Sequence, residues 1–289
     1  MKIAISGSTG FIGKQLSEFL LQSGNELIMI SRSDFAGGSN QLAKVIKSAD
    51  VIINLAGASV LRRWNKKNKQ LILSSRVDTT QLLVKAVKMN LPGHQPNIFI
   101  NASAIGIYDI NKSHDEFSTM LGTDFLALVC KAWEEATVDL KGVDLRLCTI
   151  RIGIVLGTTG GSLRKMLPLF KAGLGGKIAS GKQPFSFIHI SDFCNAIWHL
   201  IINSQSAGIY NLVCPEPTTN EKFTNTLASY LQRPALFTVP EFALKLIYGE
   251  AAGMLTTGAK VISTRLPNEG FQFKFPDIDA AIADLVKKE

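Results

Sequence analysis

The sequence predicts a doubly wound α/β fold, in which helices cover both faces of a parallel sheet. Two observations support this expectation. Apolar segments of strand length alternate with longer amphipathic segments through the first half of the 289-residue chain, a pattern typical of parallel strands that are buried on both faces. The first strand, residues 2–6, runs directly into a glycine-rich turn and a helix, which is the order in which a phosphate-binding βα unit is built.

The glycine-rich turn contains the triplet Gly7, Gly10 and Gly13. Gly7 allows a sharp turn after the strand, Gly10 leaves space where a pyrophosphate approaches the backbone, and Gly13 lets the helix pack closely on the sheet. The phosphates then bind the free N–H groups and the positive dipole end of the helix. Because strand, turn and helix flank the triplet in the required order, we expect an NAD(P)-binding Rossmann fold.

The other elements of the first half follow the same alternation. We expect strands at residues 26–30, 51–55, 98–101 and 145–150, and helices at residues 11–23, 41–47, 65–89 and 123–140. Ligands of such sheets bind beyond the carboxyl ends of the strands. The loops that follow these strands are therefore the place to look for a site.

From Leu156 onward, glycine-rich segments interrupt the regular alternation of strands and helices. Glycine-rich loops occupy residues 157–161 and 173–176, a strand at 187–192 is expected to enter a helix that ends near Asn203, and further helices are expected at 220–231 and 242–248. We predict a dinucleotide-binding domain of residues 1–155, to which the chain returns at residues 184–213. A smaller C-terminal substrate-side domain would comprise residues 156–183 and 214–289.

Composition excludes several classes of protein. No apolar run approaches the length of a membrane span, and the first strand begins at residue 2, which leaves no room for a signal peptide. The four cysteines are far apart without a CxxC pair, and the four histidines are scattered, so we predict neither a disulfide framework nor a metal site. We therefore expect a soluble cytoplasmic protein with no membrane partner.

The net charge of +8 favours anionic partners, namely a phosphorylated cofactor, a small-molecule or nucleotide-linked substrate, or nucleic acid. The densest basic run is Arg62-Arg63-Trp64-Asn65-Lys66-Lys67-Asn68-Lys69. We interpret it as the solvated start of a helix rather than a nucleic-acid site, because no nucleic-acid-binding module accompanies it.

The end of the second strand bears on the choice of cofactor. A carboxylate there would bind the adenosine ribose and repel a 2′-phosphate, whereas this chain has Ser31 followed by Arg32. A guanidinium binds phosphate bidentately and a serine can donate to it, so we expect NADP(H) rather than NAD. The alternative is that Arg32 is an exposed surface residue paired with nearby Asp34.

Several motifs give the chain a family resemblance over almost its whole length. They are Arg63-Trp64, Ser75-Arg76-Val77, Ala102-Ser103-Ala104, Trp133-Glu134-Glu135, the segments 151–157 and 173–176, Ile188-His189-Ile190 and Gly270-Phe271-Gln272. Together with the glycine turn and the loop after the third strand, they resemble the extended short-chain dehydrogenase/reductases. The match is closer to an atypical epimerase family of nucleoside-diphosphate-sugar epimerase-like proteins, some of which carry a cell-division-inhibitor name.

The resemblance implies a Rossmann fold and a nicotinamide cofactor, and it places the arginine equivalent to Arg76 near that cofactor. Leu55, Ala56 and Gly57 are expected to pass beneath the cofactor, although small residues there have an equally good packing explanation. The full set expected around the cofactor is Gly7, Thr9, Gly10, Phe11, Ile12, Gly13, Ser31, Arg32, Leu55, Ala56, Gly57, Arg76, Ala102 and Ile152.

The chain departs from the superfamily at the catalytic residues. Hydride-transferring members use a Tyr-x-x-x-Lys pair on the helix after the fourth strand, but residues 124–134 contain no tyrosine. Depending on the register, the pair becomes Phe125 with Val129 or Leu126 with Cys130. The usual strand hydroxyl falls on Ala104, one residue away from Ser103.

Substitute acids or bases are Ser103, Tyr108 and Lys131, with Cys130 on the same helix. Each also has an ordinary structural explanation: a turn hydroxyl, an amphipathic loop residue, a solvated charge and a buried thiol. Two functions stay open at this point. One is an NADP(H)-dependent oxidoreductase or epimerase with a displaced acid or base, and the other is a non-catalytic NADPH-binding sensor or scaffold.

Overall fold

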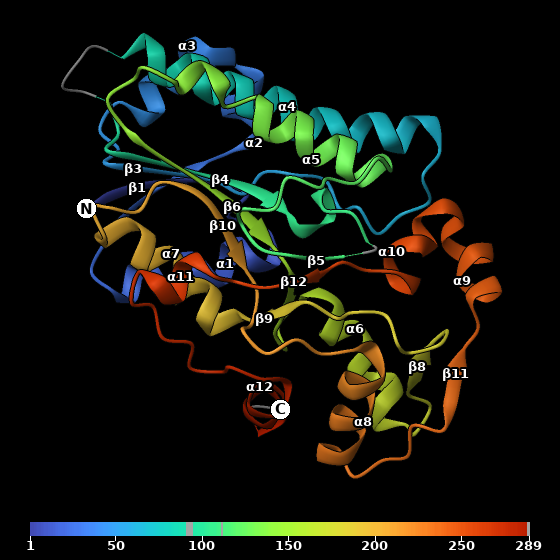
Figure 1. The fold of residues 1–289 in the computed structure, drawn as a ribbon. Coiled ribbons are helices and arrows are strands. Elements are labelled where there is room, and N and C mark those ends of the chain that lie inside the picture. The colour runs from blue at the N-terminus through green and yellow to red at the C-terminus, as the bar shows by residue number, and fades with distance from the viewer. Residues whose placement is uncertain (91–94, 111, 288–289) are drawn as a thin grey trace.

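Six parallel strands form the central sheet, in the order β10-β6-β4-β3-β1-β2 (Figure 1). They are β1 (Lys2–Ser6), β2 (Glu26–Ile30), β3 (Val51–Asn54), β4 (Ile98–Ala104), β6 (Arg146–Ile152) and β10 (Gly208–Leu212). The computed structural model describes residues 1–90, 95–110 and 112–287. Because β2 and β3 lie on opposite sides of β1, the winding reverses there, and this leaves a crevice at the carboxyl ends of β1 and β3.

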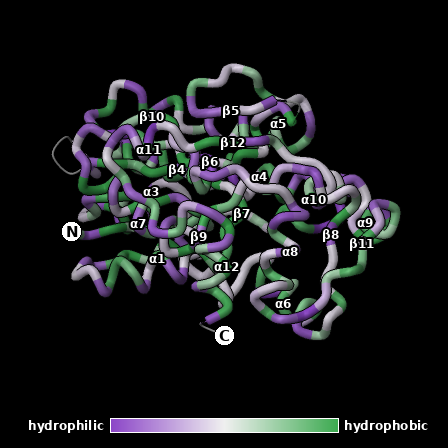
Figure 2. Tube along the Cα trace, turned by 60° about the horizontal axis from the view of Figure 1, so that its bottom comes forward, coloured by the Kyte–Doolittle hydropathy of each residue, from purple (hydrophilic) through white to green (hydrophobic). Residues whose placement is uncertain are grey.

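Helices cover both faces of the sheet, as the sequence predicts. On one face lie α1 (Phe11–Gln22), α7 (Ile190–Ile202) and α11 (Arg265–Asn268), and on the other lie α3 (Gly38–Ile46), α4 (Lys66–Met89) and α5 (Phe125–Glu135) (Figure 1). Along the tube in Figure 2, hydrophilic and hydrophobic residues alternate on the surface helices, which is typical of helices with one buried face. Within the described ranges, no helix is both long and apolar enough to cross a membrane.

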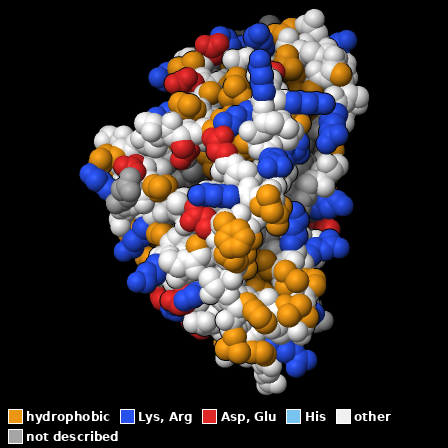
Figure 3. All heavy atoms as spheres, turned by 90° about the vertical axis from the view of Figure 1, so that its right-hand side faces the viewer, with side chains coloured by type: hydrophobic (Ala, Val, Ile, Leu, Met, Phe, Trp, Pro, Cys, Tyr) orange, Lys and Arg blue, Asp and Glu red, His pale blue; other side chains and the backbone are white. Residues whose placement is uncertain are grey.

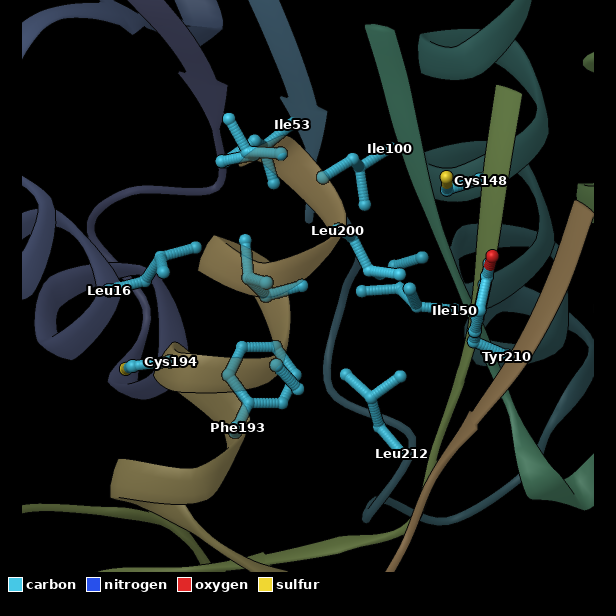
Figure 4. Close-up of a cluster of buried hydrophobic side chains, with 14 of the residues drawn as sticks. Leu16, Ile53, Ile100, Cys148, Ile150, Phe193, Cys194, Leu200, Tyr210 and Leu212 are labelled. Carbon is cyan, nitrogen blue, oxygen red and sulfur yellow. The ribbon is translucent and has the colours of Figure 1, made fainter. Parts of the chain in front are cut away.

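The main core lies between the sheet and the α1/α7 layer. Leu16 of α1 and Phe193 of α7 meet Ile53, Ile100 and Ile150 of the sheet (Figure 4), and all five side chains are fully buried. Burial of each such side chain contributes about 1.5–3 kcal/mol. This packing fixes the position of α1, and therefore of the glycine-rich turn before it, at the carboxyl end of β1.

A second set of elements surrounds a separate apolar cluster, which includes Leu163, Phe223 and Ile282. Its helices are α6 (Gly161–Lys171), α8 (Asn220–Tyr230) and α12 (Ile278–Lys287). Three short parallel pairs accompany them: β7 (Ile154–Leu156) with β9 (Phe187–His189), β8 (Gly176–Ile178) with β11 (Phe237–Val239), and β5 (Ser113–His114) with β12 (Lys260–Val261). The remaining elements are α2 (Arg32–Ala36), α9 (Glu241–Tyr248), α10 (Gly253–Thr256) and the 3-10 turns η1 (Ile105–Ile107), η2 (Val138–Leu140) and η3 (Gly249–Ala252).

Large apolar side chains are exposed beside α9. Phe242 and Leu246 are each 74% exposed, and Leu236 is 87% exposed. Figure 3 shows hydrophobic side chains gathered on this face, with Lys and Arg around them. A contiguous apolar patch of this kind is unusual on a monomer.

Several expected elements have other bounds in the structure. The strands expected at 98–101 and 145–150 extend to Ala104 and Ile152, and the strand expected at 187–192 ends at His189, after which α7 begins. The helix expected at 123–140 ends at Glu135, and residues 138–140 form the separate turn η2. The Thr137 hydroxyl donates to the carbonyl of Glu134 at 2.7 Å, a local hydrogen bond of the type that competes with helix continuation. The helix expected at 41–47 begins already at Gly38 and follows α2.

Candidate functional site

The glycine-rich turn has no room for side chains at two of its three glycines. Gly7 has φ +73°, and a Cβ there would lie 2.6 Å from the carbonyl oxygen of Leu55. A Cβ at Gly13 would overlap the carbonyl oxygen of Gly7. A Cβ at Gly10 would have its nearest neighbour 3.4 Å away, which is an ordinary contact, so this position is open to a ligand.

The first turn of α1 is left uncapped. Gly10 is its N-cap residue and offers no side chain, and the turn contains no acidic residue. The first N–H groups of a helix have no partner within the helix, so those of Phe11, Ile12 and Gly13 can receive a phosphate. Exposed Thr9 lies just before this turn.

The Phe11 ring packs so closely on the loop after β7 that glycines are required there. A Cβ at Gly157 would lie 2.7 Å from this ring, and a Cβ at Gly160 would lie 2.6 Å from it. The loop that the sequence assigns to the substrate side therefore packs directly on the first residue of α1.

At the end of β2, Ser31 and Asp34 form a capping box at the start of α2. The Asp34 carboxylate accepts hydrogen bonds from the Ser31 hydroxyl at 2.5 Å and from the Ser31 backbone N–H at 2.8 Å. These hydrogen bonds lower the pKa of Asp34 below its ordinary value. Arg32 is exposed and has no ion-pair partner among the described residues, so the suggested pair of Arg32 with Asp34 does not form.

The loop after β3 is held by Arg76. Its Nη1 donates to the carbonyl oxygens of Ala58 and Ile72, each at 3.0 Å, and its guanidinium lies 5.0 Å from the Trp133 ring. A Cβ at Gly57 would lie 3.0 Å from the guanidinium carbon. No carboxylate pairs with Arg76 among the described residues, and burial lowers its pKa.

Sequence reasoning missed a buried polar cluster that joins the carboxyl ends of β1 and β3 to the middle of β4. Asn54 of β3 accepts a hydrogen bond from the Ser6 hydroxyl of β1 at 2.6 Å, and its amide nitrogen donates to Asn101 of β4 and to Thr80 of α4, each at 2.8 Å. All four residues are fully buried. The signal in the sequence was an asparagine at or near the end of each of two otherwise apolar strands.

Strand β4 continues to Ala104, so Ser103 lies within the strand rather than beyond its end. Ser103 is 2% exposed, and its hydroxyl donates to Glu134 of α5 at 2.7 Å. Arg151 of β6 binds the same carboxylate through two hydrogen bonds of 2.9 and 2.8 Å. Ala102 is buried in the same strand, and Ile152 ends β6.

Tyr108 lies just after η1, where its side chain is buried and hydrogen-bonded to Arg151. It is 1% exposed, accepts a hydrogen bond from Arg151 Nη1 at 2.9 Å, and lies 2.8 Å from the side-chain oxygen of Asn211 in β10. Burial raises the pKa of Tyr108, although Arg151 opposes the shift. The hydroxyl is therefore protonated at neutral pH and already hydrogen-bonded within the protein.

On α5, the remaining candidates face different neighbours. Lys131 Nζ donates to the carbonyl oxygen of Gly122 at 2.8 Å. The Cys130 thiol lies beside Ser103 and Ala104, and burial raises its pKa to about 11. A Cβ at Gly106 would lie 3.5 Å from Leu126. Leu126 and Cys130 thus lie against the end of β4, and Phe125 turns toward Trp64 at 5.0 Å between ring centroids.

The glycine cradle, the strand order and the uncapped α1 agree with what comparison with known proteins finds. The family model of the NAD dependent epimerase/dehydratase family matches residues 3–212. The chain belongs to this family. A domain of unknown function, DUF1731, matches residues 239–285, which include α9, α10, α11 and all but the last two residues of α12.

Relatives of this family member cover its full length. The mouse epimerase family protein SDR39U1 is 36% identical over 99% of this chain and 100% of its own. The crystal structure of human SDR39U1 with NADPH superimposes with a TM-score of 0.93 at 34% identity, over 100% of both chains. UDP-N-acetylglucosamine 4-epimerase from Bacillus cereus matches with a TM-score of 0.78 at 16% identity, over 100% of this chain and 99% of that one, and shares the fold alone.

Proposed function

We propose that this family member binds NADPH across the crevice at the carboxyl ends of β1 and β3 and acts as an oxidoreductase or epimerase. The observation that carries the proposal is the cradle formed by Gly7, Gly10 and Gly13 before an uncapped helix. The NADPH present in the structure of human SDR39U1 supports it.

Each part of the cofactor has residues suited to it. The α1 first turn would hold the pyrophosphate, and exposed Arg32 would hold the 2′-phosphate. Arg76 offers a guanidinium edge beside Gly57, without a carboxylate to neutralise it among the described residues. When bound, the cofactor supplies hydride chemistry, and the chain's own residues orient it and exclude water.

The proposal includes the division of the chain that the sequence predicts. Residues 1–155 and 184–213 would bind the cofactor, and residues 156–183 and 214–289 would bind a small-molecule or nucleotide-linked substrate. Four buried thiols suit a reducing compartment, so we place the protein in the cytoplasm.

A second function is favoured by the composition of α5. Leu126 and Cys130 face the end of β4, and a thiol with a pKa of about 11 is a poor proton donor or nucleophile at neutral pH. A sensor of the NADPH/NADP ratio would need the cradle but not the proton chemistry.

Titration of the purified protein with NADPH and with NADH, followed by calorimetry, tests the proposal. We expect saturable binding that prefers NADPH. Absence of binding to either nucleotide would overturn both functions. Binding without turnover of any carbonyl compound or nucleotide-sugar supplied would favour the sensor.

A further inference from the structure

A hollow of about 440 Å³ opens between the N-terminal ends of α4 and α5. It is lined by Trp64, Lys66, Lys69, Gln70, Leu73 and Phe125. Its volume lies within the range of small-molecule sites. Two lysines of the basic run at residues 62–69, Lys66 and Lys69, line the hollow.

The walls of the hollow are aromatic and fixed in place. The Trp64 indole N–H donates to the carbonyl oxygen of Val60 at 3.0 Å, and its ring meets the Phe125 ring edge-on. The Lys69 ammonium lies 5.0 Å from the Phe125 ring centroid. Such rings offer a planar apolar surface to a ligand ring.

The charge of the hollow is positive. Lys66 forms no ion pair within the described part of the chain, and the first turn of α4 contains no acidic residue. Lys69 pairs with Glu250 of η3 at 2.6 Å, so Glu250 neutralises only one of the two lysines. Lysines at the positive end of a helix are unfavourably placed, and an anion in the hollow would relieve this.

The hollow adjoins the proposed cofactor loop along one helix face. Lys69, Leu73 and Arg76 follow one another at intervals of four and three residues on α4, and so lie on the same side. Arg76 packs on Trp133 as Lys69 packs on Phe125, each at 5.0 Å. The helices α4 and α5 lie side by side (Figure 1). Lys69 and Leu73, which line the hollow, and Arg76, which lies beside Gly57, therefore occupy one continuous stretch of α4.

We propose that this hollow is the substrate subsite and takes an aromatic ring that carries an anionic group. The role of the ligand as a substrate rests on the proposed function. Binding of a ligand to the hollow does not, and it can be measured separately. Trp64 and Phe125 would contact the ring, and Lys66 would bind the anion. The ion pair of Lys69 with Glu250 connects the wall of the hollow to η3 in the C-terminal part of the chain.

Indole NMR signals of ¹⁵N-labelled protein, saturated with NADPH, test the subsite with phenyl phosphate as the probe. The chain has three tryptophans, so Trp64→Phe assigns the reporting signal, and Trp133 and Trp198 serve as internal references. We expect phenyl phosphate to shift the Trp64 signal saturably and leave the Trp198 signal unchanged. Inorganic phosphate and benzyl alcohol, which each lack one half of the probe, should bind more weakly.

Two matched lysine variants distinguish specific binding of phenyl phosphate in the hollow from nonspecific electrostatic attraction to the basic run. Lys66→Met should weaken phenyl phosphate binding about fivefold, as loss of an exposed ion pair predicts, whereas Lys67→Met, on the same turn but outside the hollow, should change it little. Equal effects of both variants, no Trp64 shift, or displacement of phenyl phosphate by NADPH would each overturn the proposal. Failure of NADPH to bind contradicts the proposed function, and the same titration on the free protein then still tests the hollow.

Discussion

The Ser103 hydroxyl donates a 2.7 Å hydrogen bond to the carboxylate of Glu134, which Arg151 binds on both oxygens. The hydroxyl nearest the expected catalytic position thus points toward the ion pair of Glu134 on α5 with Arg151 on β6. Although burial opposes it, the hydrogen bonds from Arg151 to Glu134 raise the pKa of Arg151, so the guanidinium stays charged at all accessible pH. The Ser103 hydroxyl therefore helps to orient the Glu134 carboxylate toward Arg151.

Arg151→Met should destabilise the protein by about 3 kcal/mol, because removal of one partner leaves the other charge buried and unpaired. The Arg151 side chain is 5% exposed and that of Glu134 is 17% exposed. Urea unfolding measures the change. The double variant Arg151→Met/Glu134→Leu should recover part of the loss, and additive losses in the double variant would show that the two charges do not depend on each other.

Tyr108→Phe should lower stability by about 1–3 kcal/mol, since it leaves buried partners on Arg151 and Asn211 unsatisfied. NADPH affinity should stay within about twofold of wild type, because a buried hydroxyl bound to protein groups is not exposed to the cofactor. Calorimetry and thermal unfolding read out the two effects separately. Normal stability with lost turnover would instead assign Tyr108 to catalysis.

Gly10→Asp should abolish NADPH binding while it leaves the fold intact. Gly10 has φ −74° and an open Cβ direction, and Asp is a favourable N-cap. The added carboxylate would occupy and repel the phosphate position. The melting temperature should be unchanged or higher, and Gly10→Ala, which adds no charge, is the control. Undiminished NADPH binding in Gly10→Asp would place the pyrophosphate elsewhere.

Arg32→Ala should weaken NADPH binding about tenfold or more and leave NADH binding nearly unchanged, as loss of a charge-assisted phosphate contact predicts. Lys47→Ala removes an exposed cation just after α3 and is the matched control. Equal losses for the two nucleotides would show that Arg32 does not contact the 2′-phosphate.

The four thiols should be inert in the native protein at pH 8. Burial raises the pKa of Cys130 to about 11 and those of Cys148, Cys194 and Cys214 to about 12, from 9.0. The resulting stabilisation is present below pH 9, the unfolded value, and is lost as pH rises through 11 to 12. Alkylation with iodoacetamide should label none of them before unfolding; fast labelling of native Cys130 would contradict its burial.

The sequence predicted most of the sheet because local periodicity and glycine chemistry determine it. Strand β2 has the expected bounds, and α1 and α4 start or end within a residue of theirs. Strand β10 was missed, since a short segment with Asn211 in its middle has no local signal for a strand. Asn211 is buried there because its amide donates to Ile262 and its backbone N–H to Glu116, residues far away in the chain.

The candidate site likewise has one part that the sequence predicts and others that depend on contacts between distant segments. The turn that we propose as the phosphate cradle depends on glycines within the first thirteen residues, so the sequence alone is enough to predict it. The environment of Tyr108 depends on hydrogen bonds to β6 and β10, and the hollow depends on how α4 and α5 lie side by side. Neither can be read from spacing along the chain.

The position of β10 at the edge of the sheet has a consequence during synthesis. The chain makes β6 and then residues 153–207 before it makes β10, which pairs along β6. At about 5–20 residues per second, β6 has an open edge for several seconds on the ribosome. The nascent protein cannot complete its central sheet until the glycine-rich loops and α6 have emerged, so part of the second apolar cluster is synthesised before the sheet is finished.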